Sequence, residues 1–182
     1  NKDKKINLYK KEKNILFVGK LNHAKGYHIF SEAASKFKKY DPSWNFIAIG
    51  NEARKEIFPD KKIVREIGYK KNSEVLKYYS KSEIAIGNSV WDEPLGRIAI
   101  EASSRKCLPI ISNKGGLAES KNIALVLKQN TPSELVTILK KITKDKVLRK
   151  QKQKLFYKNN NFDIKIIANK LDNLRFEIIK NN

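Results

Sequence analysis

Short apolar runs alternate with amphipathic segments along most of this 182-residue chain. The runs are rich in β-branched residues and five to eight residues long, which is typical of buried strands. We expect six such strands, at 14–19, 44–50, 61–68, 83–89, 108–112 and 122–127. Between and after them, apolar residues recur three or four positions apart, which predicts helices. These cover 24–40, 72–82, 93–106, 131–143, 145–158 and 162–180, with a turn at 115–120.

This alternation predicts an α/β fold with a doubly wound parallel six-stranded sheet, Rossmann-like, and a helical C-terminal tail. Local signals mark three helix starts: Asn72 or Ser73 as a cap, Thr131 as a cap followed by proline, and Pro94 in a first turn. We expect one domain over 14–182. The basic segment 1–13 is interpreted as a linker remnant or a further strand.

A doubly wound sheet of order 3-2-1-4-5-6 places its ligand site where the first and fourth strands diverge, outside their carboxyl ends. The fold therefore indicates two loops, at 19–26 and 87–96, before any motif is considered. These are also the stretches richest in reactive and charged side chains.

The first loop has the composition of a phosphate-binding loop. Gly19 and Gly26 permit tight turns, Lys20 and Lys25 supply two cations, and a helix with free amide groups follows. His23 lies in the same loop and is expected near the ligand. The loop matches neither the dinucleotide fingerprint G-x-G-x-x-G nor a Walker A motif. The alternative is that both lysines belong to an ordinary lysine-rich surface.

The second loop leads into a segment with two carboxylates, Glu93 and Glu101, eight residues apart. On a helix this spacing brings both acids to nearly the same face. Gly96, at the expected helix start, would let a ligand approach the backbone amides. The alternatives are dipole compensation for Glu93 and a solvated surface position for Glu101, although Glu101 sits in the apolar stretch "IAIEAS".

The net charge of +20 favours an anionic partner, such as nucleic acid or a membrane surface. However, 33 of the 39 basic residues are lysines spread along the whole chain, and aromatic and basic residues do not interleave. We therefore expect no nucleic-acid partner. The single cysteine, Cys107, is interpreted as a buried thiol, which suits the cytoplasm. No metal site and no cofactor are expected.

The segments "ILFVGKLNHAKG", "FIAIG" and "IGYKKNSEVLKYYSKSEIAIGNSVWDEPLGRIAIEASSRKCLPIISNKGGLAE" resemble the C-terminal domain of retaining glycosyltransferases with two Rossmann-like domains, the GT-B class. The likeness is to the large group 1 family, which builds glycolipids, capsules and lipopolysaccharide. It runs from Ile15 to Glu119 in the family's order. It includes that family's Glu-x7-Glu element, here Glu93 and Glu101.

The resemblance implies a role for each matching position. Lys20 and Lys25 would contact the donor diphosphate, with Gly19 beside them. Glu93 would face the donor sugar, and Glu101 would bind the ribose hydroxyls. The remaining expected contacts are the amides around Leu95, Gly96 and Arg97 with the sugar and diphosphate, and Gly68 and Tyr69 with the base. Leu95 stands where the family commonly has phenylalanine, and Arg97 replaces a commonly apolar residue.

The resemblance also implies partners that the chain itself does not supply. A nucleoside-diphosphate sugar would be the donor, and a separate N-terminal domain would hold the acceptor, a cell-envelope or lipid-linked saccharide. An anionic membrane surface at the inner face of the cytoplasmic membrane is a further expected partner. The absence of methionine suggests a fragment of a longer protein, inactive without that domain. The alternatives are a sugar-nucleotide epimerase, a nucleotide-sugar-binding module without catalysis, and a basic nucleic-acid-binding domain.

Overall fold

The computed structural model describes residues 10–54, 56–160 and 164–180. Its centre is one six-stranded sheet of order β3-β2-β1-β4-β5-β6, and every neighbouring pair is parallel. The predicted fold class and strand order are confirmed. The strands are β1 (Glu12–Val18), β2 (Asn45–Ile49), β3 (Val64–Glu66), β4 (Ser82–Gly87), β5 (Leu108–Ser112) and β6 (Leu125–Leu127).

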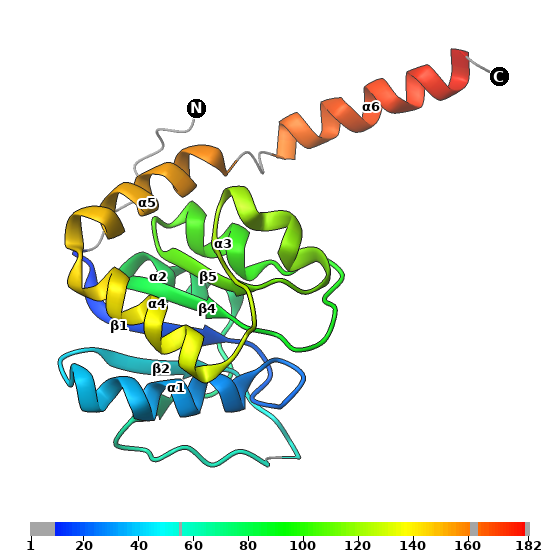
Figure 1. The fold of residues 1–182 in the computed structure, drawn as a ribbon. Coiled ribbons are helices and arrows are strands. Elements are labelled where there is room, and N and C mark those ends of the chain that lie inside the picture. The colour runs from blue at the N-terminus through cyan, green and yellow to red at the C-terminus, as the bar shows by residue number, and fades with distance from the viewer. Residues whose placement is uncertain (1–9, 55, 161–163, 181–182) are drawn as a thin grey trace.

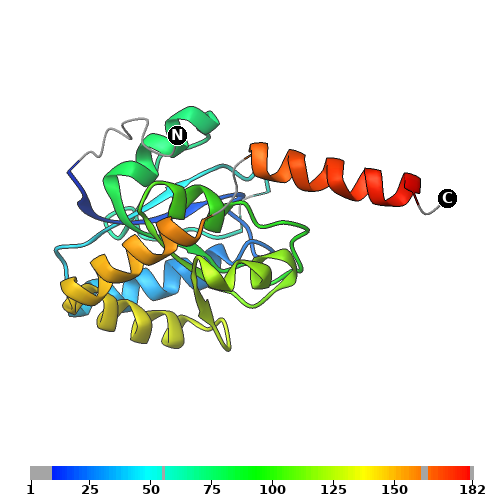
Figure 2. The ribbon, with the colours of Figure 1, turned by 90° about the horizontal axis from the view of Figure 1, so that it is seen from above.

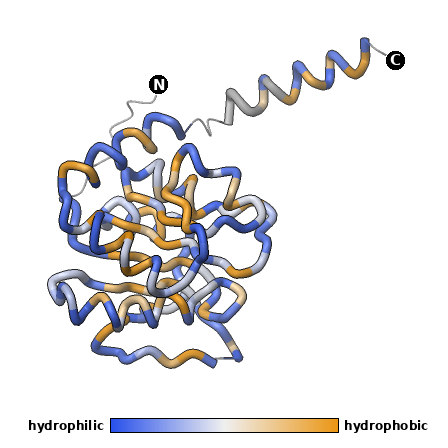
Figure 3. Tube along the Cα trace, viewed as in Figure 1, coloured by the Kyte–Doolittle hydropathy of each residue, from blue (hydrophilic) through white to orange (hydrophobic). Residues whose placement is uncertain are grey.

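Helices cover both faces of this sheet, as Figure 1 shows. One face carries α1 (Tyr27–Tyr40) and α4 (Pro132–Lys144), and the other carries α2 (Asn72–Lys81) and α3 (Ile98–Ser104). The 3-10 helix η1 (Gly115–Asn122) follows β5, and α5 (Lys146–Asn159) follows α4. Each face has its own apolar cluster, because alternate strand residues point to opposite sides. Figure 3 shows the apolar positions concentrated along the central strands.

Three helix starts test the local signals. Thr131 caps α4 as predicted, with its side chain accepting the amide of Glu134. The predicted cap of α2 is wrong by one residue: Lys71 is the N-cap and Asn72 is already helical. The predicted helix at 93–106 is also wrong at its start, because α3 begins only at Ile98, four residues after Pro94. In the loop before α3, Gly96 has a positive φ of 63°, which does not occur within a right-handed helix.

The first described residues belong to the sheet. β1 starts at Glu12, two residues before the predicted first strand at 14–19, and residues 1–9 of the basic segment lie outside the described residues. Lys11 donates to the carbonyls of Tyr79, Ser82 and Arg105, which ties this segment to the layer of α2 and α3. Burial lowers the pKa of Lys11.

A buried charge network anchors α5 to the start of β4. Arg149 lies 3.3 Å from the carboxylate of Glu83, which also accepts a hydrogen bond from Gln153, and all three side chains are buried. Burial alone would raise the pKa of Glu83, but the Gln153 hydrogen bond and the charges of Lys150 and Arg149 lower it. The guanidinium also lies 5.2 Å from the centroid of the Trp44 ring.

The last helix, α6 (Ile164–Lys180), projects away from this body (Figures 1 and 2). Its described apolar side chains are exposed, among them Leu171, Phe176 and Ile179. Among the described residues, no helix combines the length and apolar character that crossing a bilayer requires.

Candidate functional site

The two loops that follow β1 and β4 are joined by direct hydrogen bonds. The side-chain amide of Asn88 donates to the carbonyl of Gly26, and the backbone amide of Val90 donates to the carbonyl of Ala24. Gly26 has a φ of 75°, and a Cβ there would lie 2.0 Å from the carbonyl oxygen of Asn88. Only glycine fits at this contact. Gly26 therefore allows the loops after β1 and β4 to pack together at the point where the connections of these two strands diverge.

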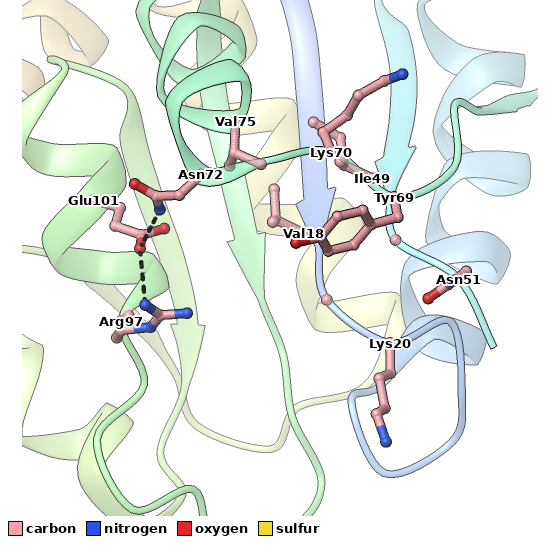
Figure 4. Close-up of a pocket in the computed structure, with 12 residues that line it drawn as sticks. Val18, Lys20, Ile49, Asn51, Tyr69, Lys70, Asn72, Val75, Arg97 and Glu101 are labelled. Atoms are coloured by element: carbon pink, nitrogen blue, oxygen red, sulfur yellow. Dashed lines mark hydrogen bonds and ion pairs between the residues drawn. The ribbon is translucent and has the colours of Figure 1, made fainter.

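A pocket of about 370 Å³ opens at the carboxyl ends of β1 and β2 (Figure 4). Its predicted members are Gly19, Lys20, Tyr69, Arg97 and Glu101. The remaining lining residues are Val18, Ile49, Gly50, Asn51, Lys70, Asn72 and Val75. Its apolar floor of valine and isoleucine, with amide, lysine and carboxylate groups around it, suits a flat ring joined to a polyhydroxylated, anionic group.

Glu101 stands at the edge of this pocket on α3. Its Oε1 accepts a hydrogen bond from the side chain of Asn72 at 3.2 Å and lies 3.9 Å from Nη1 of Arg97. Only 19% of the Glu101 side chain is exposed, against 75% for Arg97. The carboxylate is therefore largely shielded from solvent and hydrogen-bonded to a neutral donor on a second helix, which contradicts the alternative of a freely solvated surface acid.

A second, adjoining pocket of about 230 Å³ shares Gly19, Arg97 and Glu101 with the first and adds Lys25, Ser89 and Glu93. Nζ of Lys25 lies 3.0 Å from Oε1 of Glu93, with 26% and 17% of these side chains exposed. The hydroxyl of Ser89 donates to the same carboxylate oxygen. The Lys25 ammonium also lies 5.1 Å from the centroid of the Trp91 ring. The acid expected at the donor sugar and a cation expected at the diphosphate therefore form an ion pair with each other.

The loop that carries Ser89 is held from behind by two further segments. Ser112, at the end of β5, donates its hydroxyl to the Ser89 carbonyl at 2.7 Å. The side-chain amide of Asn130 donates to the carbonyls of Asn88 and Ser89, at 3.0 and 3.1 Å. Glu134 in turn accepts the backbone amide of Asn130. These contacts fix the backbone that presents Glu93.

Four predicted site residues do not line either pocket. His23 stacks on His28, with ring centroids 4.4 Å apart. Gly68 contributes its carbonyl to the amide of Gly50, while its neighbour Tyr69 is in the pocket. Leu95 is exposed, and Gly96 packs so closely on Leu117 that a Cβ would lie 2.4 Å from that side chain.

Two predicted geometries are corrected. Glu93 and Glu101 do not share a helix face, because α3 starts at Ile98; the loop geometry, not helical periodicity, brings both acids to the second pocket. The backbone amides of Lys25 and Tyr27, at the start of α1, are not free either. The Lys25 backbone amide donates to Oδ1 of Asn22, and the Tyr27 backbone amide donates to the Asn22 carbonyl. The cations of the first loop, rather than these amides, are its available anion-binding groups.

Sequence reasoning missed Asn72, Ser89, Ser112 and Asn130. Each is a small polar residue whose partner lies between 4 and 42 positions away in the sequence, and only the Ser89–Glu93 spacing of 4 is local enough to show in the sequence. Among the described residues, no group of three or more His, Cys, Asp or Glu side chains is placed to hold a metal ion.

A comparison with known protein families agrees with this geometry. The family model described as "Glycosyl transferases group 1" matches residues 1–161. The chain belongs to the group 1 glycosyl transferases. The family resemblance inferred from the sequence is thereby confirmed.

Two curated proteins are distant relatives of this group 1 glycosyl transferase, and both are longer than the chain. Spore coat protein SA of Bacillus subtilis (strain 168) is 28% identical over an alignment of 140 residues, and the match covers 68% of this chain and 37% of that protein. Glycogen synthase of Mycobacterium tuberculosis (strain ATCC 25618 / H37Rv) is 26% identical over an alignment of 113 residues, and the match covers 58% of this chain and 27% of that protein. The chain therefore spans about a third of the length of the curated relatives it matches.

Solved structures show the same fold. A glycosyltransferase from Rickettsia africae ESF-5 superposes with a TM-score of 0.78 at 24% identity, covering 93% of this chain and 48% of that one. The C-terminal domain of a group 1 family protein, LpcC, from Francisella tularensis gives 0.71 at 23% identity, covering 82% and 85%. Anabaena Alr3699/HepE in complex with UDP-glucose gives 0.76 at 16% identity, covering 91% and 49%.

Proposed function

We propose that the chain is the donor-binding domain of a retaining glycosyltransferase, and that the two adjoining pockets hold one nucleoside-diphosphate sugar. The observation that carries this proposal is the convergence of Lys20, Lys25, Glu93 and Glu101 on two pockets that share a wall. The structure of the related Anabaena protein with UDP-glucose supports a uridine diphosphate sugar as the first donor to test.

The charges suggest how such a donor would lie. The nucleoside would occupy the larger pocket, with its base on the floor near Tyr69 and its ribose hydroxyls at Glu101. The sugar would enter the smaller pocket near Glu93. Between them, at Gly19, the diphosphate would lie close to Lys20 and Lys25, and close approach of phosphate oxygens to the backbone is easiest at a glycine.

The proposed chemistry is cleavage of the bond between the anomeric carbon and the diphosphate oxygen, whose electron pair leaves with the diphosphate. Lys20 and Lys25 would stabilise the charge that develops on the leaving group, where preorganised cations act most strongly. In doing so, Lys25 would exchange Glu93 for phosphate. The released Glu93 carboxylate would then stabilise positive character at the anomeric carbon. We propose that these residues carry the step without a metal ion.

We further propose that a hexose-type sugar is transferred to a cell-envelope or lipid-linked saccharide, and that an N-terminal acceptor domain is needed for transfer. The chain covers 48% of the related Rickettsia enzyme, which is consistent with one of two domains. The charge of +20 would draw the protein to an anionic membrane surface. Co-sedimentation with phosphatidylglycerol vesicles, weakened by salt and absent with phosphatidylcholine, would support this part of the proposal.

The decisive experiment is calorimetric titration of the chain with UDP, GDP and ADP and with their glucose conjugates. We expect micromolar to millimolar binding of one nucleotide, weakened in Glu101→Ala by the loss of the ribose contact and weakened in Lys25→Ala by the loss of a cation at the diphosphate. Lys36→Ala is a matched control, since Lys36 pairs with Glu32 on the exposed side of α1. Binding of none of these nucleotides would contradict the donor-site assignment and favour the nucleic-acid alternative, testable by salt-dependent DNA binding. Donor binding without transfer by the full-length protein would favour a non-catalytic module.

A further inference from the structure

The carboxylate of Glu101 uses its two oxygens unequally. Oε1 accepts the Asn72 hydrogen bond and faces Arg97, as the dashed lines in Figure 4 show. Among the residues that the structure describes, Oε2 has no hydrogen-bond or ion-pair partner. Because Glu101 lines both pockets, this second oxygen is available as an acceptor for a ligand. A carboxylate held by one oxygen has its direction fixed while it keeps acceptor capacity at the other.

Of the two groups at Oε1, Asn72 is the one that can set the direction. Its distance of 3.2 Å is at the limit of an ordinary hydrogen bond, whereas the 3.9 Å to Arg97 is beyond it. The Arg97 side chain is 75% exposed, so its interaction is weakened by solvent and by salt. Asn72 is also neutral, so it orients the carboxylate without cancelling the negative charge.

Both ends of this hydrogen bond stand on packed helices. Asn72 is the first residue of α2, and the turn is fixed by Glu74, whose carboxylate accepts the amide of Lys71 at 3.2 Å. Val75 lies one helical turn after Asn72 on α2, and Ala102 follows Glu101 on α3. Both belong to the same buried apolar cluster. The bond therefore joins two elements whose separation is set by the core, which is what positioning a functional group requires.

We propose that Asn72 is a positioning residue that holds Glu101 so that Oε2 meets the ribose hydroxyls of the donor. Asn72 thereby determines how strongly the site prefers a ribonucleotide to one without these hydroxyls. This inference rests on the proposed function, in which Glu101 binds the ribose. Under this proposal, the selectivity for the ribose of the nucleoside depends on a residue of α2, outside the loops that follow β1 and β4.

The test compares the affinity for UDP, GDP and ADP with that for their 2′,3′-dideoxy counterparts, measured by calorimetry on the whole chain. In the unchanged chain we expect the ribonucleotide to bind more tightly, and Glu101→Ala to remove most of this preference. In Asn72→Ala the preference should fall about three- to tenfold, the loss expected for one ordinary hydrogen bond, because Asn72 orients the acceptor and does not itself touch the ribose; dideoxynucleotide affinity should be unchanged. Ser73→Ala, at the exposed neighbouring position, is the matched control.

A second variant guards against a folding defect. Asn72→Asp keeps the size of the side chain and places an acid in the first turn of α2, where it favours the helix. It should still lower the preference, because two carboxylates repel and Glu101 would turn away. Equal weakening of ribo- and dideoxynucleotide binding in the Asn72 variants, or an unchanged preference, would overturn the role of Asn72 while leaving the Glu101 result intact. A preference that survives in Glu101→Ala would instead refute the proposed ribose contact, and the inference with it.

Discussion

Replacement of Gly26 by alanine tests whether close packing of the two switch loops stabilises the domain. Two costs are expected. The first is conformational, since an L-residue at a φ of 75° costs about 1–2 kcal/mol. The second is steric, because the new Cβ would lie 2.0 Å from the carbonyl oxygen and 2.8 Å from the carbonyl carbon of Asn88. These are backbone atoms that cannot turn aside, so an overpacking cost of about 1–3 kcal/mol is added.

Gly68 provides the control for the conformational part. Its φ of 71° is nearly the same, but a Cβ there would have no neighbouring atom within 4 Å. Gly68→Ala should therefore pay only the first cost, and the entropy that alanine removes from the unfolded chain cancels between the two variants. Gly26→Ala should be less stable than Gly68→Ala by about 1–3 kcal/mol, or about 2–12 °C in Tm for a chain of this size.

The assay is urea unfolding followed by circular dichroism, with thermal melts in parallel. If Gly26→Ala were no less stable than Gly68→Ala, the contact with Asn88 would not constrain the loops. The close approach of Gly26 to Asn88 would then not be what holds the two loops together.

Three further predictions concern buried groups. The pKa of Glu83 is held below its ordinary 4.5, so its contribution to stability is present above that pH and is lost as the pH falls through the lower folded-state pKa. Below about pH 4.5 the free energy of unfolding should therefore fall more steeply with pH in the unchanged chain than in Glu83→Gln, as acid unfolding curves would show. Burial raises the pKa of the Cys107 thiol to about 12, so iodoacetamide at pH 8 should label it only after denaturation, and rapid native labelling would contradict this. The buried Tyr79 hydroxyl has no hydrogen-bond partner among the described residues, so Tyr79→Phe should leave stability unchanged or raise it by up to about 1 kcal/mol; a fall in the unfolding midpoint would argue otherwise.

The fold was predictable because its signals are local and redundant. Six apolar runs separated by helical patterns leave few parallel arrangements, and the connection rules select the observed strand order. The Thr131 cap was predictable for the same reason, since its hydroxyl and its partner amide lie three residues apart.

The start of α3 was not predictable, because contacts with a distant segment decide it. Pro94 favours a helix start, but the amide of Gly116 donates to the carbonyl of Glu93, and Gly96 is pressed onto Leu117. The 3-10 helix η1 therefore holds this stretch as a loop. Asn72 and Asn130 escaped sequence reasoning in the same way: neither belongs to a motif, and each acts on a residue that only the fold brings near.

The contact between Lys25 and Glu93 has a consequence for the choice of ligand. A small anion such as inorganic phosphate that binds Lys25 in place of Glu93 must separate this ion pair, and it brings neither a base nor a ribose to compensate for the loss. A nucleoside-diphosphate sugar would break the same pair while filling both pockets. If the site binds the proposed donor, this ion pair would favour large ligands anchored at several points over small anions at Lys25.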